Sequence, residues 1–392
     1  MDANATTPLL PEVFEAMRPF WMEHYGNASS IHQQGQHARA AVDRARESVA
    51  HLLRCRTSEV VFTSGGTESD NLAIFGTVGG AVGERPHLIT TSVEHDAVLH
   101  AAESLEKQGV EVTFLPCTAQ GLIEPETLRR AMRPNTRLVS VMFANNETGV
   151  IQPIAELAAI AHAGGALFHT DAVQAAGKLP IDLSPKGPLR EVDLLTLSGH
   201  KIHAPKGIGV LFVRRNVRLA PMMHGGMHER QRRAGTENVA GIVGLGKAAE
   251  MAQDWLKTDG GDRLAGLRDR LEQSILALVE EAGVNGAGAP RVFNTANLYF
   301  DHVEAEALVI ALDLTGLSVS GGSACQSGAT EPSHVLTAMG LGPARARASI
   351  RFSLSKLTTG DEVDEALALI PTAVARLREL SPTHGIAAKS VA

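Results

Sequence analysis

Short apolar runs alternate with helix-like segments from about residue 37 to residue 255, and this alternation constrains the fold more than any other feature. Apolar residues recur at helical spacing between Ala38 and Leu53, which predicts an amphipathic helix there. Apolar runs that are joined by helices predict a mainly parallel sheet covered on both faces, and hence an α/β fold. The runs lie at residues 60–62, 87–90, 110–115, 138–143, 167–168, 194–197 and 210–213, separated by helical segments such as 94–108 and 154–163.

The pattern changes after about residue 256. At 392 residues the chain is long enough for two domains. We therefore predict a large domain over residues 13–256 and a smaller α+β domain over residues 1–12 and 257–392. The second part is expected to contain a helix over 263–281, a strand over 295–300, a helix over 304–314, a loop over about 320–332, a strand over 350–353 and a helix over 361–380.

Composition excludes several classes of protein. The formal net charge of −7 provides no basic surface for nucleic acid. No apolar run approaches the roughly 18 residues of a membrane span, and the acidic start is unlike a signal peptide. Cys55, Cys117 and Cys325 are too few and too scattered for a disulfide framework or a zinc site. We therefore predict a cytoplasmic protein with reduced cysteines. His224 and His228 are four residues apart but lie in a Gly- and Arg-rich stretch typical of an irregular loop, so no metal site is predicted there.

A carboxylate and a lysine end two successive apolar runs. Asp171 follows the run that contains Phe168, and Lys201 ends the next such run about thirty residues later. A pyridoxal-phosphate enzyme needs a lysine amine for a Schiff base and a buried carboxylate to keep the pyridine nitrogen protonated. A lysine at a strand end is ordinarily a solvated terminus, so Lys201 gains this interpretation only together with other features.

Two further segments fit such a cofactor. Gly65-Gly66-Thr67 leaves an apolar run and opens a helix, where backbone N–H groups and the Thr67 hydroxyl can bind phosphate. The plainer alternative for this segment is a glycine turn with a helix cap, and it is no Walker loop. His95 also follows an apolar run and can stack on a flat ring and move protons, although a lone histidine is more often structural.

Cys325 differs from the other two cysteines in its surroundings. Small residues flank it on both sides over 320–328, which predicts an exposed loop. Cys55 and Cys117 lie in or beside apolar segments and are expected to be buried, the usual state of cysteine. A thiolate on such a loop can move between a buried cofactor and an outside acceptor, so we predict a reactive thiol at Cys325.

The chain resembles the cysteine desulfurases of the NifS/IscS family, which are fold-type I pyridoxal-phosphate enzymes. The region around Cys325 resembles the long-loop class, and residues 144–149, 198–205 and 377–382 are most similar to the nitrogen-fixation branch. The opening Met1-Asp2-Ala3 and Gln326 depart from the family pattern, and neither removes a catalytic group. The motifs that carry the likeness, in family order, are residues 4–8, 26–32, 63–71, 94–95, 145–149, 169–174, 198–205, 232–238, 323–325, 331–336 and 349–354.

The resemblance implies a role for each matching residue. Lys201 would form the Schiff base, His95 would stack on the ring as an acid and base, and Cys325 would be the sulfur-accepting nucleophile. The remaining implied contacts are Asp171 with the pyridine nitrogen, Gln174 with the ring hydroxyl oxygen, Gly66, Thr67, Ser198 and His200 with the phosphate, Thr236 with the phosphate from a second subunit, and Asn146 and Arg351 with the substrate carboxylate.

The implied activity is conversion of L-cysteine to L-alanine with a persulfide on Cys325. The implied partners are a second copy of the chain, because Thr236 has a role only across an interface, and an iron–sulfur scaffold protein, which serves nitrogenase clusters in the nitrogen-fixation branch. Two alternatives stay open at this point. One is a selenocysteine lyase, or another fold-type I lyase or aminotransferase that does not use Cys325, and the other is a non-catalytic scaffold that keeps the fold.

Overall fold

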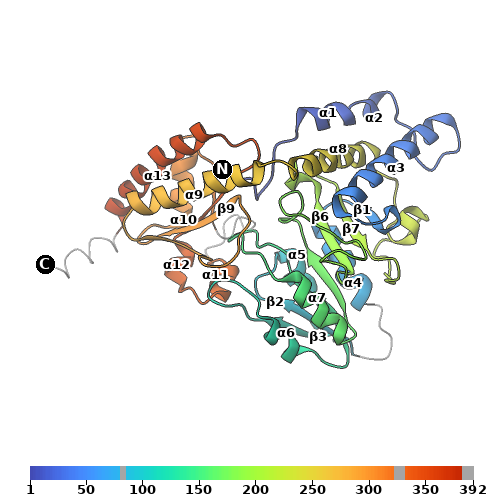
Figure 1. Ribbon diagram of the computed structural model, residues 1–392, viewed down its shortest axis with the longest axis horizontal. Coiled ribbons are helices and arrows are strands. Elements are labelled where there is room, and N and C mark those ends of the chain that lie inside the picture. Colours follow the sequence, from blue (N-terminus) through green and yellow to red (C-terminus); the bar gives the residue numbers. More distant parts are fainter. Residues whose placement is uncertain (80–84, 322–331, 382–392) are drawn as a thin grey trace.

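The computed structural model describes residues 1–79, 85–321 and 332–381, and its larger sheet has seven strands (Figure 1). The strands are β1 (Val60–Thr63), β2 (His87–Thr91), β3 (Glu111–Leu115), β4 (Thr136–Ser140), β5 (Leu167–Asp171), β6 (Leu194–Ser198) and β7 (Gly209–Val213). Their order is β1-β7-β6-β5-β4-β2-β3. The pairs from β3 through β6 are parallel, whereas β7 runs antiparallel to both β1 and β6. The predicted α/β fold with a mainly parallel sheet is confirmed.

Alternate strand residues enter two different cores, one on each face of this sheet. Val60 and Phe62 belong to one hydrophobic cluster, while Val61 between them belongs to the other. The first cluster includes side chains from α1 (Pro11–Met17), α3 (Gln33–Leu53), α7 (Ile154–Ala163) and α8 (Val239–Trp255), and the second from α4 (Gly66–Val78) and α5 (Asp96–Lys107). Burial on both faces explains why the strands read as continuous apolar runs.

A second, four-stranded sheet lies apart from the first in Figure 1. Its strands β8 (Ala282–Val284), β9 (Thr295–Phe300), β10 (Ser320–Gly321) and β11 (Ser349–Ser353) are antiparallel in the order β10-β11-β9-β8. Side chains of α9 (Gly260–Leu278), α10 (Ala305–Asp313) and α13 (Gly360–Leu380) build its core. Backbone hydrogen bonds join Met1 and Ala3 to Ser353, so the N-terminal residues lie along β11. The predicted domain boundaries stay a prediction.

Most differences from the predicted elements have a local reason. The strand predicted over 138–143 ends at Ser140, although Val141 and Phe143 still donate to carbonyls of β5. Several short helices were not predicted: α2 (Pro19–Met22), α6 (Pro125–Ala131) and α12 (Pro343–Arg347), together with α1, all open with proline, and α11 (His334–Ala338) follows Ser333. Proline suits the first helical turn, but such short segments show too little periodicity to be recognised.

Helices α3 and α8 approach each other closely at Gly246. A Cβ atom at Gly246 would lie 2.6 Å from the Cα atom of Ala45, which is backbone and cannot move alone. We expect Gly246→Ala to lower the free energy of unfolding by about 1–3 kcal/mol, since the helices must separate. Gly266→Ala is the control, because Gly266 lies in α9 with no atom within 4 Å of the added Cβ.

Chemical denaturation of the two variants measures the effect. Gly266→Ala should raise the free energy of unfolding by about 0.5–1 kcal/mol, because glycine is unfavourable within a helix. Equal changes in the free energy of unfolding in the two variants would contradict the close approach at Gly246.

Candidate active site

A cavity of about 440 Å³ lies where the ends of β5 and β6 meet the start of α4 and the N-terminal segment. Residues from both sheets line it, because Arg351 comes from β11. The predicted site residues that the structure brings together here are Gly66, Thr67, His95, Asn146, Asp171, Gln174, Ser198, His200, Lys201 and Arg351. Their roles in the reaction remain predictions.

The pairing of β5 with β6 brings the carboxylate and the lysine to one edge of the sheet. Asp171 is the last residue of β5, and Lys201 lies in the 3₁₀ turn Gly199–Lys201 directly after β6. Asp171 Oδ1 accepts a hydrogen bond of 2.8 Å from the backbone N–H of Val173. Burial raises the pKa of Asp171, and the nearby His95 and Lys201 act in the opposite direction. A cation placed beside this carboxylate would therefore stabilise its ionised form.

Lys201 points toward the N-terminal segment. Its Nζ donates to the backbone carbonyls of Asn4 at 2.5 Å and Ala5 at 2.7 Å. These carbonyls hold the ammonium group at the cavity, where an amine is needed for covalent bonding to an aldehyde.

The start of α4 lies at the cavity, where a phosphate-binding corner was predicted. A Cβ at Gly66 would lie 3.5 Å from Cβ of Ser198, which shows how closely the helix approaches the end of β6. The first N–H groups of a helix have no partner within it, so they favour an anion beside Gly66 and Thr67. His200 lies at the same end of the cavity, where its Nδ1 is 3.1 Å from the hydroxyl of Thr6. Burial, with the charges of Lys201 and Lys206, lowers the pKa of His200 to about 4, so this ring is neutral at neutral pH.

His95 begins α5 and has a defined tautomer. Its Nδ1 accepts a hydrogen bond of 3.1 Å from the backbone N–H of Ala97. A backbone N–H can only donate, so Nδ1 carries no proton and the proton of the neutral ring lies on Nε2. His95 is half-buried and lines the cavity, where Nε2 can exchange a proton with a bound molecule.

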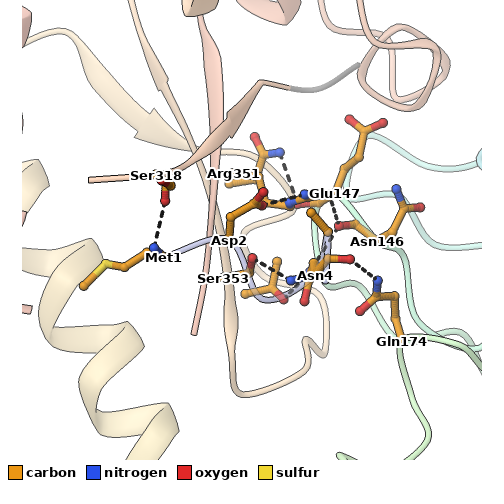
Figure 2. Close-up of polar contacts among 12 residues, drawn as sticks. Met1, Asp2, Asn4, Asn146, Glu147, Gln174, Ser318, Arg351 and Ser353 are labelled. Carbon is orange, nitrogen blue, oxygen red and sulfur yellow. Dashed lines mark hydrogen bonds and ion pairs between the residues drawn. The ribbon is translucent and has the colours of Figure 1, made fainter. Parts of the chain in front are cut away.

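Arg351 is held by two partners at the wall of the cavity (Figure 2). One terminal nitrogen donates to the carbonyl of Asn146 at 3.0 Å, and the other donates to Asp2 Oδ1 at 2.9 Å. The side chain is only 4% exposed, and its Nε is buried without a partner among the described residues. The guanidinium group therefore retains hydrogen-bonding capacity toward a carboxylate in the cavity.

The donor set fits pyridoxal phosphate. Three residues that line the cavity each have a buried polar atom without a hydrogen-bond partner in the described part of the chain. These atoms are Asp70 Oδ1, Asn146 Oδ1 and Arg351 Nε. Buried polar atoms of this kind are rare unless a bound molecule satisfies them. Together with the lysine, the carboxylate and the helix start, they match the amine, ring-nitrogen and phosphate contacts that this cofactor requires.

Comparison with known proteins identifies the family. The class-V aminotransferase family model matches residues 1–366. Cysteine desulfurase 2 of Trichormus variabilis is 50% identical over 382 residues, which cover 97% of this chain and 94% of that protein. The cysteine desulfurase IscS of Methanosarcina thermophila is 46% identical over 382 residues, covering 97% and 93%. A solved NifS-like protein superposes with a TM-score of 0.88 at 36% identity, covering 95% of this chain and 98% of the other.

The chain belongs to the cysteine desulfurase family. It is a class-V, fold-type I enzyme that depends on pyridoxal phosphate, so the predicted family, fold, enzyme class and cofactor are confirmed. The match to the family model covers nearly the whole chain and includes both sheets.

Asn4 connects the cysteine desulfurase site to the smaller sheet, a role that the sequence did not reveal. Its backbone N–H donates to Ser353 Oγ at 2.9 Å, and its Nδ2 donates to Thr295 Oγ1 at 2.9 Å. On the other side its carbonyl accepts from Gln174 Nε2 at 3.0 Å (Figure 2). The same carbonyl also accepts from Lys201 Nζ. Asn4 lies within the recognised string 4–8, but only the fold shows that it joins β9 and β11 to the lysine.

Several buried charged groups at the site were also missed. Asp70 lines the cavity, and burial together with the neighbouring Asp171 raises its pKa. Burial raises the pKa of Glu147 to about 7, and its carboxylate accepts a hydrogen bond of 2.6 Å from Ser333 Oγ at the start of α11. Both acidic residues occur inside motif strings, where their burial leaves no signal in the sequence.

Thr236 is exposed and is not among the described residues that line the cavity. The prediction for Cys325 falls outside the described residues. Cys55 and Cys117 are half-buried and pack against the core, so the prediction that they are buried was wrong in degree. Burial raises the pKa of Cys55 to about 12 and also raises that of Cys117, so both are thiols at neutral pH.

The described residues contain neither a membrane-spanning helix nor a cluster of metal ligands. None of the described helices combines the length and apolar character needed to cross a membrane. Within the same part of the chain, no group of three or more His, Cys, Asp and Glu side chains is arranged to hold a metal ion.

Glu94 should make the stability of the protein depend on pH. Burial raises its pKa to about 8, although Thr91 Oγ1 and the N–H of Met142 both donate to its Oε1. Because the folded pKa lies above that of the unfolded chain, this group stabilises the fold least at high pH, and the loss develops from about pH 4.5 to about pH 8. Between pH 6 and pH 9 deprotonation of Glu94 should lower the free energy of unfolding by about 2–3 kcal/mol.

Glu94→Gln should remove that dependence. The difference in unfolding free energy between this variant and the unmodified holoenzyme should shift in favour of the variant as pH rises from 6 to 9. Glu106→Gln is the control, since Glu106 is exposed near the end of α5, the helix that begins just after Glu94. A difference that does not change with pH would contradict a raised pKa at Glu94.

Proposed function

We propose that the chain converts L-cysteine to L-alanine, forms a persulfide on Cys325 and supplies that sulfur for iron–sulfur cluster assembly. The observation that carries the proposal is the single cavity in which Lys201, Asp171, His95 and Arg351 meet, in a chain of the cysteine desulfurase family. Each of these groups suits one part of the cofactor or of an amino-acid substrate.

Arg351 and Asn146 would bind and orient the substrate. The guanidinium group can hold the α-carboxylate through two parallel hydrogen bonds, which sets the direction of the amino and thiol groups. Asn146 Oδ1, which has no partner among the described residues, can accept from the substrate or the cofactor. Since the cavity is lined from both sheets, substrate position depends on how the two sheets are joined.

Lys201 and His95 would move protons. When bound, pyridoxal phosphate supplies an aldehyde for covalent bonding to an amine and a ring that takes up electrons released at the substrate α-carbon. Lys201 Nζ would hold the cofactor and then accept the α-proton once the substrate amine has displaced it. Asp171 would keep the ring nitrogen protonated, and His95 Nε2 would exchange a proton with the substrate thiol.

The sulfur transfer itself would use Cys325. Its thiolate would attack the substrate sulfur, so that an S–S bond forms while the carbon–sulfur bond breaks. The electron pair of the broken bond stays with the organic product, which takes up protons and leaves as alanine. The raised pKa of Cys55 and Cys117 supports the assignment to Cys325, because a thiol rather than a thiolate is a poor nucleophile.

The wider setting forms part of the same proposal. A homodimer would bring Thr236, which is exposed in a single chain, to the phosphate of the partner's cofactor. An iron–sulfur scaffold protein would accept the sulfur in the cytoplasm. The strings at 144–149, 198–205 and 377–382 support the nitrogen-fixation branch, in which the clusters serve nitrogenase.

A single turnover with L-cysteine tests the activity. The yellow holoenzyme should gain the mass of one sulfur atom at Cys325, with one equivalent of alanine, as measured by intact-protein and peptide mass spectrometry. Cys325→Ser should abolish the persulfide, whereas Cys55→Ser and Cys117→Ser should not. Alanine without a persulfide would show a lyase that does not use Cys325, and absence of alanine would refute the substrate.

Replacement of Arg351 tests substrate binding. Arg351→Lys keeps the charge but loses the two-pronged geometry, so KM for L-cysteine should rise by about 10- to 100-fold. The control is Arg347→Lys, because Arg347 is exposed in the neighbouring helix α12. An unchanged KM in Arg351→Lys, with an unchanged melting temperature, would rule out the carboxylate contact.

A further inference from the structure

Lys178 lies next to Gln174 in the structure and has no role in the predicted site. Its Nζ donates to Gln174 Oε1 at 2.7 Å and to Asn4 Oδ1 at 3.4 Å. Gln174 lines the large cavity, whereas Lys178 lines a second cavity of about 50 Å³, and Lys201 lines both. Lys178 is therefore placed to act on the active site through Gln174 and not by contact with a bound molecule.

The surroundings of Lys178 are unfavourable for a cation. Burial, with the charges of Lys201 and Arg351, lowers its pKa to about 7, and His203 is a further basic group beside it. Among the described residues no carboxylate forms an ion pair with Lys178, and the side-chain amide oxygens of Gln174 and Asn4 accept its hydrogen bonds. A lysine here costs stability, which favours a role in holding those amide oxygens.

The contacts of Gln174 allow only one orientation of its carboxamide. The backbone carbonyl of Asn4 can only accept, and Lys178 in its protonated form can only donate. The amide oxygen must therefore face Lys178 Nζ, and the amide nitrogen must face the carbonyl of Asn4 at 3.0 Å. The nitrogen carries two hydrogens, so one remains for an acceptor in the cavity.

We propose that Lys178 is a positioning residue that holds the Gln174 carboxamide with its N–H group toward the ring oxygen of bound pyridoxal phosphate. The inference rests on the proposed contact between Gln174 and that oxygen. Without Lys178, only the Asn4 carbonyl opposes rotation of the amide, and a rotated amide presents an oxygen to an oxygen. A donor at the ring oxygen withdraws electron density from the imine that Lys201 forms, and so keeps the imine pKa low.

Titration of the visible absorbance of the holoenzyme against pH tests this role. Lys178→Met should raise the apparent pKa of the yellow chromophore by about 0.5–1 unit, as expected for one lost hydrogen bond. Removal of a cation near Lys201 would also raise this pKa, so Lys178→Met is also made in a Gln174→Met background. In that background Lys178→Met should shift the chromophore pKa by less than about 0.2 unit, because no amide remains to be oriented.

A second variant separates the donor from its charge. Lys178→Gln keeps an N–H donor without the charge. In this variant the apparent pKa of the yellow chromophore should stay as it is in the unmodified holoenzyme. This variant also decides the question if Lys178→Met fails to fold, and melting temperature and cofactor content are measured for every variant.

Three outcomes would overturn the inference. Equal shifts from Lys178→Met in both backgrounds would show a purely electrostatic effect. A shift from Gln174→Met but none from either Lys178 variant would show that the amide is oriented without Lys178, while the Gln174 contact stands. No shift from Gln174→Met would refute the contact between Gln174 and the cofactor itself.

Discussion

The parallel pairing of β5 with β6 is the constraint on which the site depends. Parallel strands end at the same edge of a sheet, so the register that sets His169 opposite Leu194 also brings Asp171 and the turn carrying Lys201 together. Helix α4 starts at that edge as well, close to Ser198. One set of backbone hydrogen bonds thus places a carboxylate, an amine and a helix N-terminus around a single cavity.

Charged groups are concentrated at this edge at a cost in folding free energy. Burial raises the pKa of Asp70, Asp171 and Glu94 and lowers that of Lys178. Each of these shifts disfavours the ionised form, and the apolar clusters on the two faces of the sheet must offset the sum. Such a cluster of shifted groups is typical of a functional site, since a structural core would avoid it.

The N-terminal segment makes the cavity a property of both sheets. Through Asn4 it joins Ser353 and Thr295 of the smaller sheet to Gln174 and Lys201 of the larger one. A displacement of the smaller sheet would therefore move Arg351 and the amine together. Under the proposed function, this coupling would keep a substrate carboxylate at Arg351 of β11 in a fixed position relative to the groups at the ends of β5 and β6.

The sequence by itself determined the elements and the chemistry. Apolar runs predicted the parallel strands, and Lys201, Asp171 and Gly66-Thr67 predicted the cofactor, because burial on both faces and cofactor chemistry each demand particular residue types. Only the tertiary structure decided that Asp2 contacts Arg351, that Asn4 links the sheets and that Lys178 faces Gln174. These contacts join residues through space or depend on how a turn directs a side chain, and neither burial nor orientation is encoded in a local pattern.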